Sequence, residues 1–241
     1  MSAMSWINRH LNRIGPEPEV RWARKGMLTR EVHVICSPYK TGTTSVGRAL
    51  IALGVGQSIM GHDGQLLQNL RPKLHRFNKL AIDAKSFNGF ARDHGGEIRQ
   101  SLGELVEALS PHDVFHDAPF GHEHIHVFVR KVIAPRARFI WINRNRKNWL
   151  RSVQAWEEAH PDTYPDHAEW KSDPEGRAEK RRQQWMFHYN QFKRLRRHDG
   201  AICLELDRVD LKNWVALAEF YDVPVPNKPF PRDNITRQPR F

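Results

Sequence analysis

Residues 32–53 read VHVICSPYKTGTTSVGRALIAL, and this stretch decides the fold. It begins with an apolar, β-branched run, passes through a short polar loop that contains Gly42, and continues as an amphipathic segment followed by Gly54. This order predicts a buried strand, a tight turn and a helix over Thr43–Leu53. Gly42 lets the backbone approach a ligand closely, and the first amides of a helix lack partners within it. We therefore expect a phosphate cradle at this turn.

The side chains of the loop fit this interpretation. Thr43 and Thr44 supply hydroxyl groups beside the helix amides, and Lys40 supplies a mobile positive charge. In the Walker A loop of ATPases and GTPases, a lysine directly follows the last glycine, but here Thr43 stands in that place. Lys40 precedes Gly42 by two residues, so a phosphate would meet the lysine from the other side of the turn. The alternative is a plain strand-to-helix turn with a threonine cap.

Short apolar runs alternate with longer amphipathic segments along the rest of the chain. We predict further strands at residues 113–117, 137–143 and 201–206, and further helices at residues 97–109, 177–197 and 211–221. Such alternation is typical of βα units that build a mainly parallel sheet. The sequence therefore predicts an α/β chain with a P-loop NTPase-like fold of three layers.

We assign residues 1–241 to one domain, because this length suits a single large core better than two thin ones. Residues 1–30 form a predicted N-terminal extension. Residues 160–176 are rich in Pro, Asp and His and are predicted to form a lid loop, and residues 223–241 form a Pro-rich tail.

The composition restricts the partners and the compartment. Lys and Arg exceed Asp and Glu by 38 to 27, a formal net charge of +11, which predicts an anionic ligand. No run approaches the ~20 apolar residues of a membrane helix, and the start lacks the apolar stretch of a signal peptide, so we expect a cytoplasmic protein. Cys36 and Cys203 lie in apolar runs and are expected as buried free thiols, with a disulfide as the alternative.

A second basic motif follows the strand predicted at residues 137–143. Arg144 comes directly after this strand, and Ser152 follows eight residues later in a segment with helical period. A guanidinium at a strand end and a hydroxyl about two helical turns later can donate to one phosphate. Residues 130–151 hold eight Lys or Arg and no Asp or Glu, which concentrates positive charge here.

The two motifs together resemble those of sulfotransferases that use 3′-phosphoadenosine 5′-phosphosulfate (PAPS). In that family a Lys or Arg precedes Gly-Thr-Thr by two residues, and an Arg at a later strand end precedes a Ser by eight. The resemblance implies that Lys40 contacts the bridging oxygen of the leaving phosphate. It implies PAPS as the sulfuryl donor, 3′-phosphoadenosine 5′-phosphate as the product, and no metal requirement. The nucleotide-binding residues that it implies are Lys40, Thr41, Gly42, Thr43 and Thr44 at the 5′ end and Arg144 and Ser152 at the 3′-phosphate.

The chain departs from the family pattern in places. Tyr39 intervenes between the usual proline and Lys40. Ser45 stands where many cytosolic members have a tryptophan, so no residue is assigned to stack on adenine. Arg146 replaces a proline but leaves the spacing to the serine unchanged. Residues 217–234 resemble the ending of a branch of small sulfotransferases, so the likeness extends over most of the chain.

Sulfuryl transfer to a hydroxyl needs a base near the acceptor proton. The strand predicted at residues 113–117 leads into Asp117-Ala118-Pro119. Cytosolic family members place the base in a His-x-Pro turn at a comparable strand end, and other branches use a carboxylate, so the resemblance implies Asp117 as the catalytic base. His116 is the alternative, but strand alternation should point it to the opposite side.

Residues 122–126, HEHIH, match the H-E-x-x-H motif of zinc proteases. On a helix, His122 and His126 would share a face and could bind zinc, with Glu123 activating a water molecule. No convincing third ligand accompanies the motif, and its surroundings predict parallel α/β structure. We therefore favour a polar helix start and assign no metal site.

The favoured function is transfer of a sulfuryl group from PAPS to a hydroxyl or amine of a small-molecule or glycan acceptor. A P-loop nucleotide or small-molecule kinase is the first alternative, although it would need a Mg²⁺-binding acid and a lysine in the Walker position. A basic, non-enzymatic protein that binds polyanions such as nucleic acid on a degenerate P-loop scaffold is the second. Because two separately spaced motifs agree, we do not expect nucleic acid as the partner. The acceptor pocket is expected around residues 60–90 and 160–176.

Overall fold

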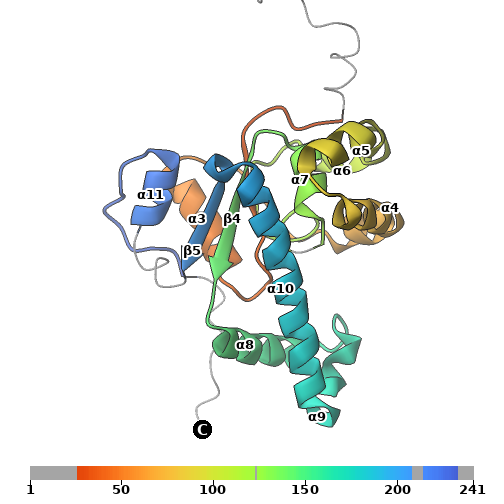
Figure 1. Cartoon of the computed structure of the whole chain (residues 1–241). Coiled ribbons are helices and arrows are strands. Elements are labelled where there is room, and N and C mark those ends of the chain that lie inside the picture. The colour runs from red at the N-terminus through yellow and green to blue at the C-terminus, as the bar shows by residue number, and fades with distance from the viewer. Residues whose placement is uncertain (1–25, 123, 208–213, 233–241) are drawn as a thin grey trace, which may run out of the picture.

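A five-stranded parallel sheet organises the computed structural model, which describes residues 26–122, 124–207 and 214–232 (Figure 1). The strand order is β2-β3-β1-β4-β5, and every neighbouring pair is parallel. The strands are β1 (Val32–Ile35), β2 (Ile59–Met60), β3 (Val114–Phe115), β4 (Ala137–Asn143) and β5 (Cys203–Asp207).

The central pair of strands sets the geometry of the sheet edge. β1 pairs with β4 in a register that runs from Val32 opposite Ala137 to Ile35 opposite Ile140. The pairing continues past the end of β1, because the Ile142 amide donates to the hydroxyl of Ser37 at 2.7 Å. The chain segments that leave β1 and β4 therefore emerge side by side at the same edge.

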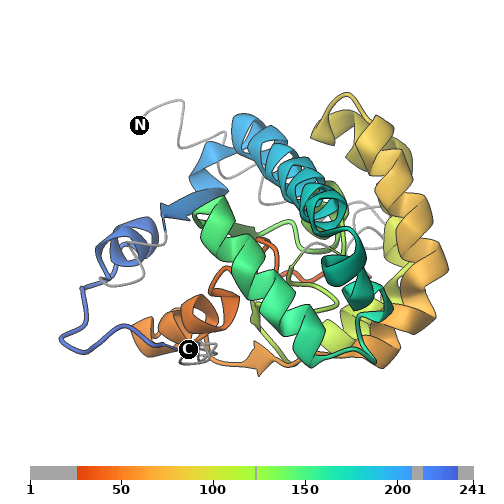
Figure 2. The same cartoon turned by 90° about the horizontal axis from the view of Figure 1, so that it is seen from below.

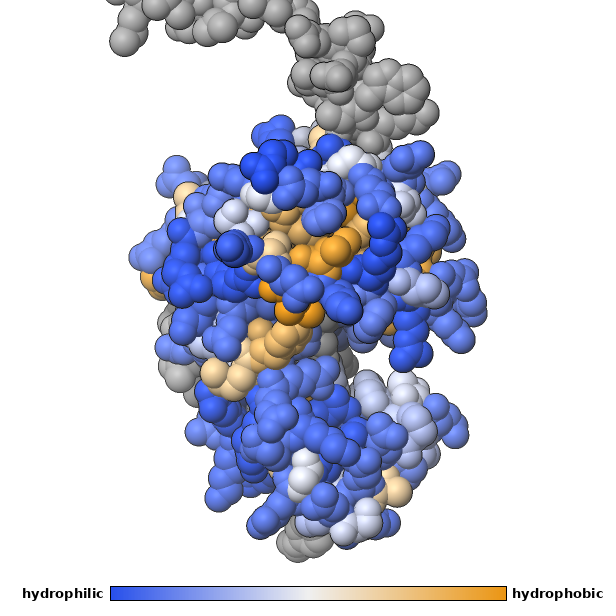
Figure 3. Space-filling model, turned by 45° about the vertical axis from the view of Figure 1, so that its right-hand side comes forward, coloured by the Kyte–Doolittle hydropathy of each residue, from blue (hydrophilic) through white to orange (hydrophobic). Residues whose placement is uncertain are grey.

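Helices cover both faces of this sheet. In chain order they are α3 (Thr43–Leu53), α4 (Gly64–Asp83), α5 (Phe87–Ser101), α6 (Gly103–Leu109), α7 (Val127–Ile133), α8 (Arg146–Ala159), η1 (Pro165–Ala168), α9 (Glu169–Ser172), α10 (Pro174–His198), η2 (Gly200–Ile202) and α11 (Val215–Tyr221). Figure 1 shows α3 and α11 on one side of the sheet and α4 to α7 with α10 on the other. Seen from below in Figure 2, α8 lies across the carboxyl ends of the strands. The face of the molecule in Figure 3 is largely hydrophilic, with one patch of apolar side chains exposed on it.

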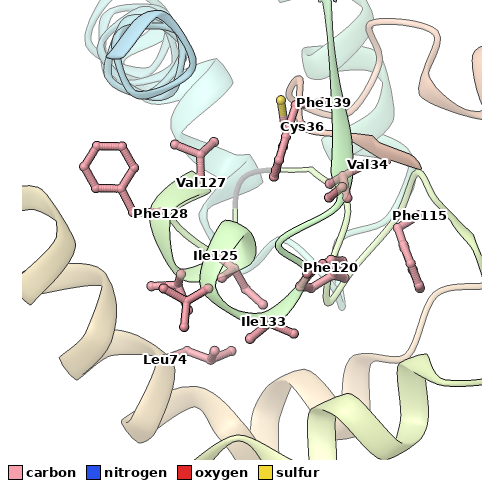
Figure 4. Packing of buried hydrophobic residues seen from close by; sticks show 14 of the residues in the cluster. Val34, Cys36, Leu74, Phe115, Phe120, Ile125, Val127, Phe128, Ile133 and Phe139 are labelled. Carbon is pink, nitrogen blue, oxygen red and sulfur yellow. The ribbon is translucent and has the colours of Figure 1, made fainter. Parts of the chain in front are cut away.

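Alternate residues of the central strands supply two separate apolar cores. Val34, Phe139 and Trp141 belong to the larger core, on the side of α4 to α7 and α10. Ile35, Ile140 and Ile142 belong to the smaller core, together with residues of α3 and α11. Figure 4 shows part of the larger core, in which Phe115 and Phe120 meet edge to face with ring centroids 5.1 Å apart. This is the three-layer, P-loop NTPase-like α/β fold that the sequence predicts.

Several element boundaries differ from the sequence prediction. The helix predicted at residues 97–109 is two helices separated at Leu102, and only Val114 and Phe115 of the strand predicted at 113–117 form a regular strand. β2 and the 20-residue α4 were not predicted. α4 buries Leu66, Leu70, Leu74, Phe77 and Ala81 at helical spacing, but Pro72 interrupts this pattern in the sequence.

The segment predicted as a lid loop, residues 160–176, contains the short helices η1 and α9, and Trp170 of α9 is buried. Its movement remains a prediction. In the Pro-rich tail, the Trp214 indole donates to the Lys228 carbonyl at 2.6 Å, and Phe230 packs on the Trp214 ring. The rest of the tail from residue 233, and residues 1–25 of the predicted extension, lie outside the described residues.

Cys36 and Cys203 are both free and buried, so the disulfide alternative is wrong. The physical reason is the strand order. Cys36 directly follows β1 and Cys203 begins β5, with β4 between them. Two inter-strand spacings amount to about 10 Å, beyond the reach of a disulfide. None of the helices within the described ranges is long and apolar enough to span a bilayer.

Candidate functional site

The β1–α3 loop, residues 36–42, has an unusual backbone. Lys40 and Gly42 both have positive φ angles, of 64° and 111°. Such a conformation suits glycine but is uncommon for a lysine, so the surroundings must hold it in place. The Thr41 hydroxyl contributes by donating to the Pro38 carbonyl at 2.8 Å. Gly42 then caps α3 without a side-chain hydrogen bond, so the positive end of the helix faces the loop.

The Lys40 ammonium lies over an aromatic ring of α8. Its Nζ is 4.1 Å from the centroid of the Trp156 ring, a cation–π contact. Burial lowers the pKa of the Lys40 amine from its ordinary value, and the positive charge of Arg144 lowers it further. Trp156 stands one helical turn after Ser152, so α8 presents both side chains on the face nearest the loop.

Arg144 joins the two predicted phosphate sites. Its Nη2 donates to the Ser152 hydroxyl at 2.8 Å, and its Nη1 donates to the main-chain carbonyl of Lys40. The contact follows from the sheet, because β1 and β4 are adjacent and parallel. The structure thus brings together the residues predicted for the 5′ and 3′ ends of a nucleotide.

Asp117 lies two residues after the end of β3, close to the start of α3. Its Oδ1 is 3.5 Å from Nδ1 of His122 and 3.4 Å from Nδ1 of His62. The other ring nitrogen of His122, Nε2, is 3.2 Å from the Thr43 hydroxyl at the start of α3. A polar chain therefore runs from a half-exposed carboxylate, through one imidazole, to the first residue of the predicted cradle.

The chain matches the model of a known protein family. A family model described as a sulfotransferase domain matches residues 33–167, more than half of the chain. The chain belongs to the sulfotransferase family. The matched range includes the β1–α3 loop, Asp117 and the Arg144–Ser152 pair. No curated protein matches the chain.

The position of His122 between Asp117 and Thr43 in this sulfotransferase was not predicted from the sequence. In the sequence, His122 stood out only as part of a metal motif. It occupies a tight turn with φ 51°, and the buried guanidinium of Arg130 donates to its carbonyl and, at 3.1 Å, to that of Gly121. A side chain at Gly121 would overlap the backbone of Asp117. Burial lowers the pKa of His122 to about 3, although the Asp117 charge opposes the shift, so the imidazole is neutral near pH 7.

Two other histidines of this part of the chain, His116 and His126, have different environments. The His116 side chain packs on α3, where a Cβ added to Gly47 would lie 2.7 Å from its ring. The charges of both His116 and Asp117 act on His122, so the opposite orientation of the two side chains stays a prediction. His126 is buried and caps α7, and its Nδ1 accepts the Phe128 amide at 3.0 Å.

The H-E-x-x-H stretch does not form the helix that a zinc protease needs. His122 lies in a turn and His126 precedes α7, so the two side chains do not share a helical face. Glu123 lies outside the described residues. Among the residues that are described, no group of three or more His, Cys, Asp and Glu is arranged to hold a metal ion.

A buried carboxylate of the sulfotransferase supports the β1–α3 loop from behind. Glu157 of α8 is fully buried and accepts a hydrogen bond from the Tyr39 hydroxyl. It also accepts from the Trp170 indole at 2.8 Å and from Arg177 at 2.9 Å, and it pairs with Arg181. Burial acts to raise the pKa of Glu157, but these donors outweigh it and lower the pKa. The residue before Lys40 is thereby tied to α9 and α10.

Proposed function

We propose that this chain transfers a sulfuryl group from PAPS to a hydroxyl or amine of a small-molecule or glycan acceptor. The observation that carries the proposal is the contact of Arg144 with both Ser152 and Lys40. It supports two anion sites that adjoin at one edge of the sheet, as a nucleotide phosphorylated at both ends requires. The sulfotransferase family match supports the same class of reaction.

The proposed donor site divides between the two motifs. Lys40, Thr41, Gly42, Thr43 and Thr44 would hold the 5′-phosphate through loop amides, hydroxyls and the start of α3. Arg144 and Ser152 would hold the 3′-phosphate with a guanidinium fork and a hydroxyl. Bound there, PAPS would supply an activated sulfuryl group on a phosphate leaving group. The positive φ of Gly42 and the cations of both motifs fit such a ligand.

We propose Asp117 as the base. Its carboxylate would take the acceptor proton while the acceptor oxygen or nitrogen bonds to sulfur and the sulfur–oxygen bond to the phosphate breaks. Lys40 would stabilise the negative charge on the leaving phosphate. His122 is a second candidate for the base, since its neutral imidazole lies between Asp117 and Thr43.

We also propose that the chain forms a single domain. We propose a cytoplasmic location, which the two free buried thiols support because a reducing compartment keeps thiols free.

Isothermal calorimetry with 3′-phosphoadenosine 5′-phosphate, and separately with ATP plus Mg²⁺, tests the donor. Selective binding of the first is the expected result. Preference for ATP would favour the kinase, and indifference to both, with salt-sensitive binding of polyanions, would favour the non-enzymatic alternative. A panel of phenols, sugars and amines with labelled PAPS then tests transfer.

A further inference from the structure

A cavity of about 330 Å³ opens between α8, α9 and α10. We call it the α8–α10 cavity. Its lining residues are Arg146, Lys147, Leu150, Arg151 and Gln154 of α8, Trp170 of α9, and Pro174, Ala178 and Arg182 of α10. At 3.6 residues per turn, these α8 positions lie on the face opposite Ser152 and Trp156. The cavity is therefore separate from the proposed donor site.

The walls of this cavity are strongly positive. Four of the lining residues are cationic and none is acidic. Arg146 donates to the Met186 sulfur at 2.9 Å, and Arg151 donates to the Asn148 side chain, so both have neutral partners. Arg182 pairs with Glu179 at 2.6 Å. Among the described residues, no acidic side chain forms an ion pair with Arg146 or Arg151. The positive charges of these two residues in the cavity are therefore not balanced by ion pairs.

Part of the cavity lining is apolar and held in place. Leu150, Trp170, Pro174 and Ala178 supply it. The Trp170 side chain is fixed because its indole N–H donates to the buried Glu157 carboxylate at 2.8 Å. A lining that combines apolar and cationic side chains suits a ligand with an apolar body and one anionic group.

We propose that the α8–α10 cavity binds a small, soluble amphipathic anion, in which a sulfate, phosphate or carboxylate is attached to a flat apolar body. The anionic group contacts Lys147 and Arg151, and the apolar body lies along Leu150 and Trp170. A cavity of about 330 Å³ has the size of a small-molecule site rather than of a macromolecular interface. This inference does not depend on the proposed transfer reaction.

Calorimetry with 2-naphthyl sulfate as the probe tests this proposal on the full chain. Saturable binding is expected, with 2-naphthol and inorganic sulfate each binding at least about tenfold more weakly, because each lacks one half of the recognised chemistry. Arg151→Glu should weaken naphthyl sulfate binding about tenfold or more through charge repulsion, and Arg151→Lys should retain most of it.

The matched control is Arg197→Glu, which makes the same charge change at an exposed position on α10 outside the cavity. It should change the affinity less than about twofold, and both variants should unfold at the wild-type temperature. Equal binding of 2-naphthol, an undiminished affinity in Arg151→Glu, or an equal loss in both variants would overturn the proposal. So would binding of phosphatidylserine vesicles without naphthyl sulfate binding, which would indicate a membrane surface instead.

Discussion

The guanidinium of Arg144 donates a hydrogen bond to the main-chain carbonyl of Lys40, across two adjacent parallel strands. The same guanidinium donates to Ser152 at 2.8 Å. Arg144 is therefore both a candidate phosphate ligand and a support for the left-handed backbone at Lys40. Substitutions in the two motifs should have effects that are not independent, because residues in one hydrogen-bond network do not contribute additively.

Lys40→Ala should lower kcat by about 10²–10³, because it removes the charge that stabilises the leaving phosphate. Labelled PAPS with a confirmed acceptor gives kcat, and calorimetry gives the affinity for the product nucleotide. Lys193→Ala, at an exposed position of α10, is the control and should leave kcat within about twofold of wild type. An unchanged kcat in Lys40→Ala would remove this lysine from the proposed mechanism.

Arg144→Ala should weaken the binding of 3′-phosphoadenosine 5′-phosphate by about 10–100-fold, the loss expected for a hydrogen bond to a charged group. Arg144→Lys should recover only part of the affinity, because an ammonium cannot reach Lys40 and Ser152 with one planar fork. Ser152→Ala should cost less, about fivefold. Calorimetry measures all three variants, and an Arg144→Ala protein with wild-type affinity would disprove the assignment.

Asp117→Asn should lower kcat by about 10²–10⁴ with little change in KM if the carboxylate takes the acceptor proton. His122→Gln separates the two candidates for the base. A small effect of His122→Gln supports Asp117, whereas a loss as large as that of Asp117→Asn would indicate that Asp117 orients a histidine base. Because the pKa of His122 is lowered to about 3, its titration should produce no inflection in the rate between pH 5 and 8.

Stability should fall as the pH drops from about 6.5 towards 3, because buried histidines stay neutral in the fold and take up protons when the chain unfolds. Burial, together with smaller contributions from nearby Arg charges, lowers the pKa of His126 and His188 to about 3. His126→Asn keeps a helix cap and should reduce the pH dependence of the unfolding temperature. His75→Asn, on an exposed part of α4, should not. Equal slopes for wild type and His126→Asn would contradict this prediction.

Glu157→Gln should destabilise the fold by about 3–5 kcal/mol, because it leaves the cations of Arg177 and Arg181 without their buried counter-charge. Tyr39→Phe removes only one hydrogen bond to the same carboxylate and should cost about 1 kcal/mol. Urea unfolding followed by circular dichroism measures both. A Glu157→Gln protein no less stable than Tyr39→Phe would show that the buried ion pairs contribute little.

The central βα unit could be predicted from the sequence because its signals are local. Gly42 and Gly54 mark the two ends of α3, and the apolar run before Ser37 marks β1. The closeness of Arg144 to the β1–α3 loop also followed once both segments were placed at the ends of parallel strands. α4 was missed because Pro72 lies within its apolar pattern, and β2 because two residues carry too short a pattern.

The candidate site could be predicted only in part. Lys40 and Asp117 stood out through their place in motifs, but the contact of His122 with Thr43 joins positions 79 residues apart. It depends on a tight turn at Gly121 and on Arg130 holding the carbonyls of that turn. Neither local propensity nor hydrophobic period contains this information, because the contact arises from tertiary packing.

The two buried thiols simplify spectroscopy on this molecule. Burial raises the pKa of Cys36 and Cys203 to about 12, so neither is an accessible thiolate at neutral pH. Maleimide dyes or spin labels should therefore react only with cysteines introduced at exposed positions, and the native sulfur atoms need no replacement. A labelled pair such as Asp162→Cys and Arg71→Cys would then report the distance between residues 160–176 and α4 as nucleotide is added.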